Sequence, residues 1–402
     1  MSFCSSPEPS VEYRWIDGVE RLEMYEPGGY HPVMIDDILH KRYGIVDKLG
    51  YGGYSTIWLA RDETLKRYVA VKIGISSPSL PQREIHVLRA LHSSRSSSKA
   101  PAGPDTNALP SVLDAFDIHG PNGSHACYTL TPAQGNLKEA SFSRLFPIQV
   151  ARALAARLAT AVASVHSRGF VHGDSLDLHL RNVLVRLPST FEGLSVEEFR
   201  EKFGKPDMVP IARVDEKPLT PNVPAQAVVP LYLGKKAQDF TLDDANGLIL
   251  SDFGEAFSPA TEQRIKFIFS ESETQDELVA EQIDVLGYHG FPESWRNQWE
   301  RLRKEEDCEN GVIPRQPIGD RETWPSLEDA FEEFVQKYRR RREAAGTFDE
   351  EETRAILDLM RRMLKFRPSE RLTIDEVLNS EWMIDWALPE LGGSYTSLTS
   401  RK

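Results

Sequence analysis

The sequence has few cysteines and no pattern that would use them. Cys4, Cys127 and Cys308 are the only three in 402 residues. They are too few and too widely spaced for a disulfide framework or a zinc site. No apolar run is expected to span a membrane, and the N-terminus lacks the basic start and apolar core of a secretory signal. We therefore expect a cytoplasmic or nuclear location, in a reducing compartment and without membrane contact.

An excess of basic residues is also missing. The chain carries 48 Lys and Arg against 61 Asp and Glu, a net charge of -13. This balance argues against direct binding of nucleic acid and would favour basic partners. From net charge alone, however, solubility is the preferred interpretation. At 40% hydrophobic and 27% charged residues, the composition is that of an ordinary globular protein long enough to bury a core.

A glycine-rich turn lies between two β-rich runs in residues 43–60, which read YGIVDKLGYGGYSTIWLA. Such a pattern predicts a β-hairpin. Gly50, Gly52 and Gly53 would allow the backbone to approach a phosphate closely. Taken alone, the turn is more often an ordinary hairpin turn, so its function depends on the residues that follow.

A strand that contains a lysine follows the hairpin. Residues 68–73 read YVAVKI, and Lys72 lies between apolar neighbours, so it must find a partner or extend its charged end to solvent. An amphipathic helix is predicted over residues 82–91, and its Glu84 is the candidate partner. Two further strands over residues 111–130 would complete a small β-rich lobe.

The chain divides into an N-terminal extension (1–41), a β-rich lobe (42–131), a larger lobe (132–390) and a disordered tail (391–402). Within the larger lobe, residues 188–247 are rich in Pro and charge without a sustained period, so we expect an inserted spacer that is partly ordered at best. Apolar periodicity predicts helices over 147–168, 276–287, 326–345, 353–364 and 373–378. The third helix would turn Leu327, Phe331, Phe334 and Tyr338 inward and end in a solvated basic run, Arg339 to Arg342.

Two stretches pass from apolar residues to an Asp and then turn: FVHGDSLDLHLRNVLV at 170–185 and LILSDFGEAF at 248–257. The first carries Asp174, Asp177 and Asn182, and the second carries Asp252. Carboxylate and amide oxygens on adjacent loops could hold a divalent cation beside a hydroxyl nucleophile. Phosphoryl transfer needs this arrangement, because positioning and charge neutralisation supply most of its catalysis.

These motifs together resemble a eukaryotic Ser/Thr protein kinase of the SR-protein-kinase-like group. The marks are GGYHPV at 28–33, LGYGGYSTIW at 49–58, VHGD at 171–174, the insert between the two Asp loops, and EWM at 381–383. The resemblance covers most of residues 25–390. It implies an α+β, bilobal fold with a small β-rich N-lobe and a mainly helical C-lobe that is truncated internally.

The resemblance also implies ATP and Mg²⁺ as cofactors, and basic Arg/Ser-rich proteins such as splicing factors as substrates. On this basis Lys72 holds the α and β phosphates and is held by Glu84, while Asn182 and Asp252 hold Mg²⁺. The expected ATP-binding residues are Leu49, Gly50, Tyr51, Gly52, Gly53, Tyr54, Ser55, Ile57, Ala70 and Lys72.

The catalytic base is one of two residues. The family spacing of five positions from base to metal-binding Asn is met by Asp177 and Asn182, whereas Asp174 meets the His-x-Asp pattern with His172. The fixed geometry of the loop favours Asp177. The position two residues later, where many kinases have a Lys, then holds His179.

The segment after the Asp-Phe-Gly (DFG) motif is shorter than a protein kinase requires. Residues 258–275 read SPATEQRIKFIFSESETQ, without an A-P-E motif or a following buried helix. In the family these elements shape the peptide-binding surface and support the catalytic loop, so we expect slow transfer. Arg371 matches the Arg that pairs with the A-P-E Glu, and must be solvated or paired elsewhere.

Three functions remain open. The first is an active SR-type kinase. The second is a catalytically deficient pseudokinase, or the product of an altered transcript, that binds nucleotide or a protein partner. The third is a small-molecule kinase with the same fold. The GGYHPV stretch and the position of the insert argue against the third, and the short segment after DFG favours the second for turnover.

Overall fold

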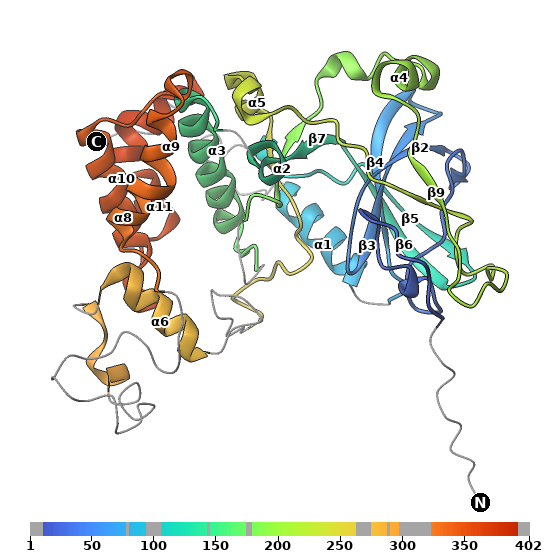
Figure 1. Cartoon of the computed structure of the whole chain (residues 1–402), viewed down its shortest axis with the longest axis horizontal. Helices are drawn as coiled ribbons and strands as arrows, with labels where there is room; N and C mark the ends of the chain where they lie inside the picture. Colours follow the sequence, from blue (N-terminus) through green and yellow to red (C-terminus); the bar gives the residue numbers. More distant parts are fainter. Residues whose placement is uncertain are drawn as a thin grey trace, which may run out of the picture.

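The computed structural model of the protein describes residues 11–77, 80–93, 106–142, 145–173, 179–262, 275–287, 290–296 and 323–392. They form a β-sheet N-lobe and a mainly helical C-lobe (Figure 1). The N-lobe sheet has the strand order β1-β2-β3-β4-β6-β5, and each neighbouring pair is antiparallel. Its strands are β1 (Ile38–Leu39), β2 (Tyr43–Gly52), β3 (Ser55–Asp62), β4 (Arg67–Gly74), β5 (Asp114–Gly120) and β6 (Gly123–Leu130). The predicted hairpin and the three further strands are confirmed.

The sheet separates a packed face from the face that bears Lys72. Because successive side chains of a strand point to opposite faces, Val71 packs in a core cluster with Trp58, while Lys72 points to the other side. There it meets helix α1 (Leu80–His92), whose Leu88 is buried in a second cluster. The helix expected from the amphipathic pattern is confirmed.

The insert over residues 188–247 is folded, so the expectation of a partly ordered spacer is wrong. Its elements are η3 (Ser189–Phe191), α4 (Val196–Phe203), β9 (Met208–Pro210), β10 (Gln226–Val228), η4 (Ala237–Asp239) and α5 (Leu242–Asn246). Phe199 of α4 is fully buried in a cluster that includes Tyr68 of the sheet. Capping boxes at Ser195 and Thr241 start α4 and α5 by satisfying amides at each helix start. Figure 1 shows the insert running along the N-lobe from α4 to β9.

Residues 11–41 of the expected extension are folded as well, with the short 3₁₀ helix η1 (Leu22–Met24). The extension lies against the insert: the Arg14 amide donates to the Ala212 carbonyl over 2.9 Å. An apolar cluster joins the two segments through Leu22, Tyr25, Tyr30, Ile211, Val223 and Ala227. The extension and the insert therefore pack against each other.

The C-lobe combines a small sheet with helices. Its three-stranded antiparallel sheet has the order β11-β8-β7. The strands are β7 (Ala133–Asn136), β8 (Val183–Arg186) and β11 (Leu248–Leu250). The α-helices are α2 (Leu137–Ser141), α3 (Ile148–Ser167), α6 (Gln275–Leu286), α8 (Leu327–Phe331), α9 (Lys337–Arg340), α10 (Glu350–Met363) and α11 (Ile374–Leu378). Short π-helical segments cover Glu332–Gln336 and Met383–Ala387, and 3₁₀ segments cover Thr106–Ala108, Glu343–Ala345, Pro368–Glu370 and Leu388–Leu391.

Helix α3 is the central helix of this lobe. By length and composition it could cross a membrane, which the sequence prediction overlooked. Most of it is instead buried in the protein, with Leu154 in the main C-lobe cluster and Val165 in the cluster beneath α1. Leu391 joins the main cluster, whereas residues 393–402 of the expected tail lie outside the described residues.

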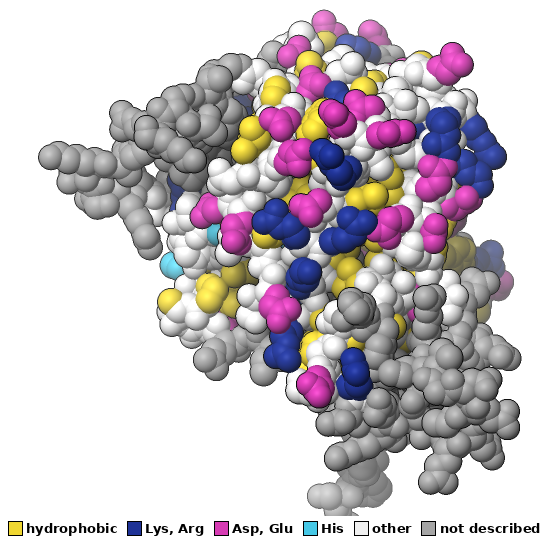
Figure 2. Space-filling view, turned by 90° about the vertical axis from the view of Figure 1, so that its left-hand side faces the viewer, with side chains coloured by type: hydrophobic (Ala, Val, Ile, Leu, Met, Phe, Trp, Pro, Cys, Tyr) yellow, Lys and Arg dark blue, Asp and Glu magenta, His cyan; other side chains and the backbone are white. Residues whose placement is uncertain are grey.

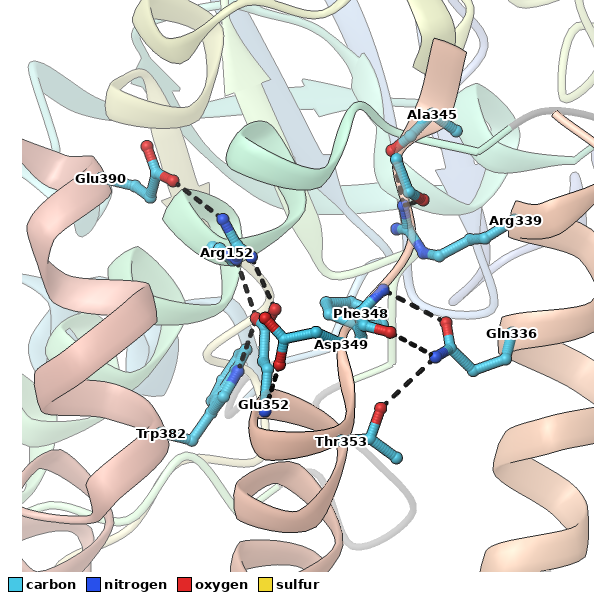
Figure 3. A network of polar contacts seen from close by, with 11 residues as sticks. Arg152, Gln336, Arg339, Ala345, Phe348, Asp349, Glu352, Thr353, Trp382 and Glu390 are labelled. Carbon is cyan, nitrogen blue, oxygen red and sulfur yellow. Dashed lines mark hydrogen bonds and ion pairs between the residues drawn. The ribbon is translucent and has the colours of Figure 1, made fainter. Parts of the chain in front are cut away.

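An ion pair between a partly buried arginine and a fully buried glutamate fastens α10 to α3. The Arg152 guanidinium binds both carboxylate oxygens of Glu352, with Nε–Oε1 and Nη2–Oε2 distances of 2.8 and 2.5 Å. Glu352 also accepts a hydrogen bond from the Trp382 indole over 3.1 Å, and Arg152 reaches Glu390 over 3.3 Å. Figure 3 shows these residues converging from α3, α10 and the C-terminal segments.

The helical run from α8 to the 3₁₀ turn at Glu343–Ala345 departs from the predicted face. Phe334 and Tyr338, predicted to face inward, are about half exposed, whereas Gln336 and Arg339 are buried. The run contains a π-helical segment, whose wider turn shifts the phase of the residues that follow. Arg339, expected in a solvated end, donates to the Ala345 carbonyl over 2.9 Å.

Candidate functional site

A cleft of about 1490 Å³ lies between the glycine-rich turn and the C-lobe. Residues of β2, β3, β4, α1, β6, β8 and β11 line it. From the expected ATP-binding set it includes Leu49, Gly50, Tyr51, Gly52, Ser55, Ile57, Ala70 and Lys72. Gly53 and Tyr54, at the tip of the turn, are not among the lining residues of the described chain, and Tyr54 is exposed. A smaller cavity of about 340 Å³ between α1 and β5 contains none of the expected site residues.

Lys72 and Glu84 form an ion pair at the back of this cleft. The Lys72 Nζ atom lies 2.7 Å from Glu84 Oε2 and 3.7 Å from Asp252 Oδ1. Burial alone would lower the pKa of Lys72, but the Glu84 carboxylate, with Tyr128 and Asp252, raises it well above its ordinary value. Lys72 is therefore a fixed cation, and the partner that its burial required is the one expected from the sequence.

The DFG motif is fixed from two sides. Phe253 is fully buried, and its amide donates to Glu84 Oε1 over 3.2 Å, so one carboxylate holds both Lys72 and this loop. The Phe253 ring packs edge-on against His172, with centroids 4.8 Å apart. A His172 ring nitrogen in turn lies 2.9 Å from the Ser251 carbonyl oxygen. Asp252 has a φ of 63°, a left-handed conformation that is uncommon for residues other than glycine.

Asn182 directly precedes β8, which pairs with β11, the strand that leads into the DFG motif. Its carbonyl oxygen accepts hydrogen bonds from the Ser251 amide and hydroxyl over 2.8 and 3.0 Å. Asn182 and Asp252 both line the cleft. An amide oxygen and a carboxylate suit Mg²⁺, which usually takes only one or two protein ligands and completes its shell with water and phosphate oxygens. The described residues contain no group of three or more His, Cys, Asp or Glu side chains that could hold a metal ion.

The two candidate bases, Asp174 and Asp177, lie outside the described residues. The residues before them are well fixed: the Val171 and Phe257 backbones exchange hydrogen bonds of 2.8 and 3.0 Å. Gly173 has a φ of 75°, and a Cβ there would overlap the Glu255 carbonyl oxygen. The catalytic loop thus starts against the segment after DFG, and only glycine fits at this point.

His179, on the other side of these candidate bases, lines the cleft. It occupies the position at which many kinases carry a lysine if Asp177 is the base. The Asn182 amide donates to the His179 carbonyl over 2.9 Å, so the return of the loop into β8 is also fixed. The structure therefore places the end of the loop at His179 in the cleft wall, whereas its start lies against Phe257.

The segment after DFG is tied to α1. Arg83, the neighbour of Glu84, donates to the Ala256 carbonyl over 3.1 Å and to Glu262 Oε2 over 2.7 Å. Arg371, the residue whose family partner is missing from the sequence, donates to the Lys365 carbonyl oxygen over 2.8 Å. Its guanidinium is therefore paired with backbone, one of the two outcomes expected.

Sequence reasoning missed part of the cleft wall. Gly18 of the extension and Val229, Pro230, Leu231 and Tyr232 of the insert line the cleft. The Leu231 amide donates to the Lys48 carbonyl of β2 over 2.8 Å. The GGYHPV stretch marked the extension as part of the resemblance, but nothing in the local pattern placed the insert here.

The fold is that of a protein kinase. A solved crystal structure of a kinase domain aligns with 88% of the chain and 98% of its own length, with a TM-score of 0.55 and 13% sequence identity. The predicted α+β, bilobal kinase-like fold is therefore confirmed. No family model matches the sequence.

Curated relatives are similar to this chain over shorter segments, and their names are those of SR-protein and serine/threonine kinases. Protein kinase dsk1 of Schizosaccharomyces pombe is 35% identical over 171 residues, 41% of this chain and 30% of the relative. SRSF protein kinase 3 of Homo sapiens is 39% identical over 106 residues, 26% of this chain and 18% of the relative. Serine/threonine-protein kinase spk-1 of Caenorhabditis elegans is 32% identical over 167 residues, which are 40% of this chain and 16% of the relative. The similar segments thus span less than a third of these relatives.

Proposed function

We propose that the protein is an ATP- and Mg²⁺-dependent serine/threonine kinase of the SR-protein type, with slow transfer to peptide. The observation that carries the proposal is the contact of Glu84 with both Lys72 and the DFG backbone, at 2.7 and 3.2 Å. A buried cation with a fixed carboxylate next to a metal-binding Asp is the arrangement that phosphoryl transfer uses.

We assign a role in this reaction to three residues of the cleft and to the two candidate bases. Lys72 would bind the α and β phosphates, and Asn182 and Asp252 would hold Mg²⁺, which when bound would neutralise charge on the phosphate oxygens. Asp177 or Asp174 accepts the proton of a substrate serine hydroxyl while the serine oxygen attacks the γ-phosphorus. The bond from the γ-phosphorus to the β–γ bridging oxygen breaks, and ADP leaves.

The proposed substrates are basic, Arg/Ser-rich proteins. The support is the net charge of -13 and the names of the relatives. The C-lobe does not add a uniformly acidic face on the side seen in Figure 2, where basic and acidic side chains are mixed. Several C-lobe pairs neutralise one another, among them Arg354–Glu381 and Arg362–Asp358. The described residues of this face therefore add no support for a basic substrate.

Nucleotide binding with little or no transfer is the second candidate. Only residues 258–275 separate the DFG stretch from the next predicted helix, and they contain no A-P-E. Without that surface a hydroxyl is not held within the roughly 3–3.5 Å that in-line attack requires. A protein that binds ATP but does not position the substrate hydroxyl has affinity for the nucleotide without a high rate of transfer.

Titration of ATP with Mg²⁺ tests the nucleotide site. We expect Lys72→Ala and Asp252→Ala to weaken ATP about 10- to 150-fold, the usual range for losing a charged hydrogen bond or ion contact. Lys66→Ala is the control, because Lys66 is an exposed lysine next to the same strand, paired only with exposed Glu63. Thermal unfolding of each variant shows whether it is folded. Unchanged affinity in both folded site variants would refute the assignment.

A further inference from the structure

The N-terminal extension reaches the glycine-rich turn through one side chain. The Tyr30 hydroxyl donates a hydrogen bond of 2.8 Å to the Gly52 carbonyl oxygen at the end of β2. Tyr30 is buried, and its ring packs edge-on against Tyr25 with centroids 5.5 Å apart. A buried tyrosine usually needs a partner for its hydroxyl, and here that partner is the turn.

The glycines of the turn have open space beside them. At Gly50, Gly52 and Gly53 the space that a Cβ would occupy has no atom within 4 Å. Hydrogen bonds from outside the hairpin therefore have more influence on the position of this turn than they would on a packed one.

The backbone of Tyr30 is itself fixed. Its amide donates to the Met24 carbonyl over 2.8 Å, and its carbonyl accepts from the Asn122 side chain over 2.6 Å. A Cβ at Gly29 would overlap the Met24 carbonyl oxygen, so this close turn requires glycine.

The insert completes the support. The side chains of Asn122 and Asn222 face each other: Asn222 Nδ2 donates to Asn122 Oδ1 over 2.5 Å, and Asn122 Nδ2 donates to the Asn222 carbonyl over 2.9 Å. The β5–β6 turn, the extension and the insert therefore share one set of hydrogen bonds. The apolar cluster of extension and insert surrounds Tyr30.

A buried ion pair forms a second link between the extension and β2. Lys48 is fully buried and paired with Glu20, which also accepts a hydrogen bond from the Tyr25 hydroxyl. The Lys48 ammonium lies 5.7 Å from the centroid of the Tyr51 ring, next to Gly52. The extension thus holds β2 at two neighbouring points just before the turn.

We propose that the extension, supported by the insert, positions the glycine-rich turn for the phosphates of the nucleotide, with Tyr30 as the positioning residue. This inference rests on the proposed binding of ATP at the same site. Tyr30 acts through the Gly52 backbone, so it influences the phosphate end of the ligand. The base and sugar depend instead on the apolar cleft wall.

Comparison of ATP–Mg²⁺ with adenosine in Tyr30→Phe tests the inference. The variant keeps the ring and removes only the hydroxyl. We expect it to bind ATP about three- to tenfold more weakly, the range for one hydrogen bond, and adenosine within about twofold of the unaltered chain. Asn222→Ala, which touches neither turn nor cleft, should weaken ATP in the same direction by about two- to threefold.

Tyr43→Phe is the matched control, because Tyr43 is a buried tyrosine at the opposite end of β2 whose hydroxyl binds Asp114 over 2.7 Å. It should leave both affinities unchanged. Equal losses for ATP and adenosine in Tyr30→Phe would show a purely structural role, and no loss for either would show no role, so both results overturn the inference. Failure of the unaltered chain to bind ATP would overturn the proposed function and this inference with it.

Discussion

Replacement of Arg152 by Met should destabilise the C-lobe more than the loss of any exposed ion pair. Its partner Glu352 has a fully buried side chain, and Arg152 contacts both carboxylate oxygens (Figure 3). Removing one partner of a buried pair typically costs about 3–5 kcal/mol, because the other charge stays buried. The Trp382 indole still donates to Glu352, so we expect the lower end, about 3 kcal/mol. Domains are stable by only about 5–15 kcal/mol.

Urea unfolding followed by tryptophan fluorescence measures this effect. The expected result is a lower midpoint for Arg152→Met at an unchanged slope. Arg354→Met is the control: the Arg354–Glu381 pair spans 3.3 Å, but its side chains are 69% and 54% exposed. Pairs of that kind contribute about 0–1 kcal/mol. The double variant Arg152→Met/Glu352→Leu should recover part of the loss, since it removes the buried charge. Equal effects of Arg152→Met and Arg354→Met would refute the reasoning.

Two further predictions concern the catalytic base and the response to pH. In a transfer assay, Asp177→Asn should lower the rate by about 10²–10⁴-fold and Asp174→Asn by less; the reverse order would assign the base to Asp174. Burial and the neighbouring His125 lower the pKa of His31 to about 4, below the ordinary value of about 6.5. As the pH falls, His31 is therefore protonated in the unfolded chain before it is protonated in the folded protein. Stability should therefore fall as the pH drops from about 6.5 towards 4. Chemical denaturation of His31→Gln should show a shallower fall, and an identical one would assign the effect to other groups.

The contacts around Lys72 could be predicted because burial limits the possibilities. A lysine within an apolar strand needs a carboxylate, and the next amphipathic helix offered Glu84. The candidate roles of Asp252 and Asn182 were predicted from their match to sequence motifs of the kinase family. Asp174 and Asp177 satisfy different parts of one motif, so local pattern alone could not choose between them.

The support of the N-lobe could not be predicted in the same way. Lys48 pairs with Glu20, and Asn122 pairs with Asn222, across separations of 28 and 100 residues. Local periodicity carries no information on such contacts. The capping boxes of the insert were a local signal, because Ser or Thr followed by an acidic residue three positions later typically starts a helix. Its Pro and charge content obscured that signal.

The direction of a helix face was mispredicted for a local reason. The periodic pattern placed Phe334 and Tyr338 inward on the assumption of a regular α-helix. The π-helical segment Glu332–Gln336 breaks that period, and Arg339 is buried instead. A single α-helical period assumed over residues 326–345 does not reveal a local change of helix type.

Transfer of the γ-phosphoryl group to an Arg/Ser peptide tests the central claim most directly. The unaltered chain is compared with one in which an SR-protein-kinase activation segment and its following helix are inserted after Phe257. Both should bind ATP–Mg²⁺ with similar affinity. The account predicts transfer at least about 100-fold slower in the unaltered chain, the loss that a misplacement of about 1 Å can cause. Equal rates in the two chains would contradict it.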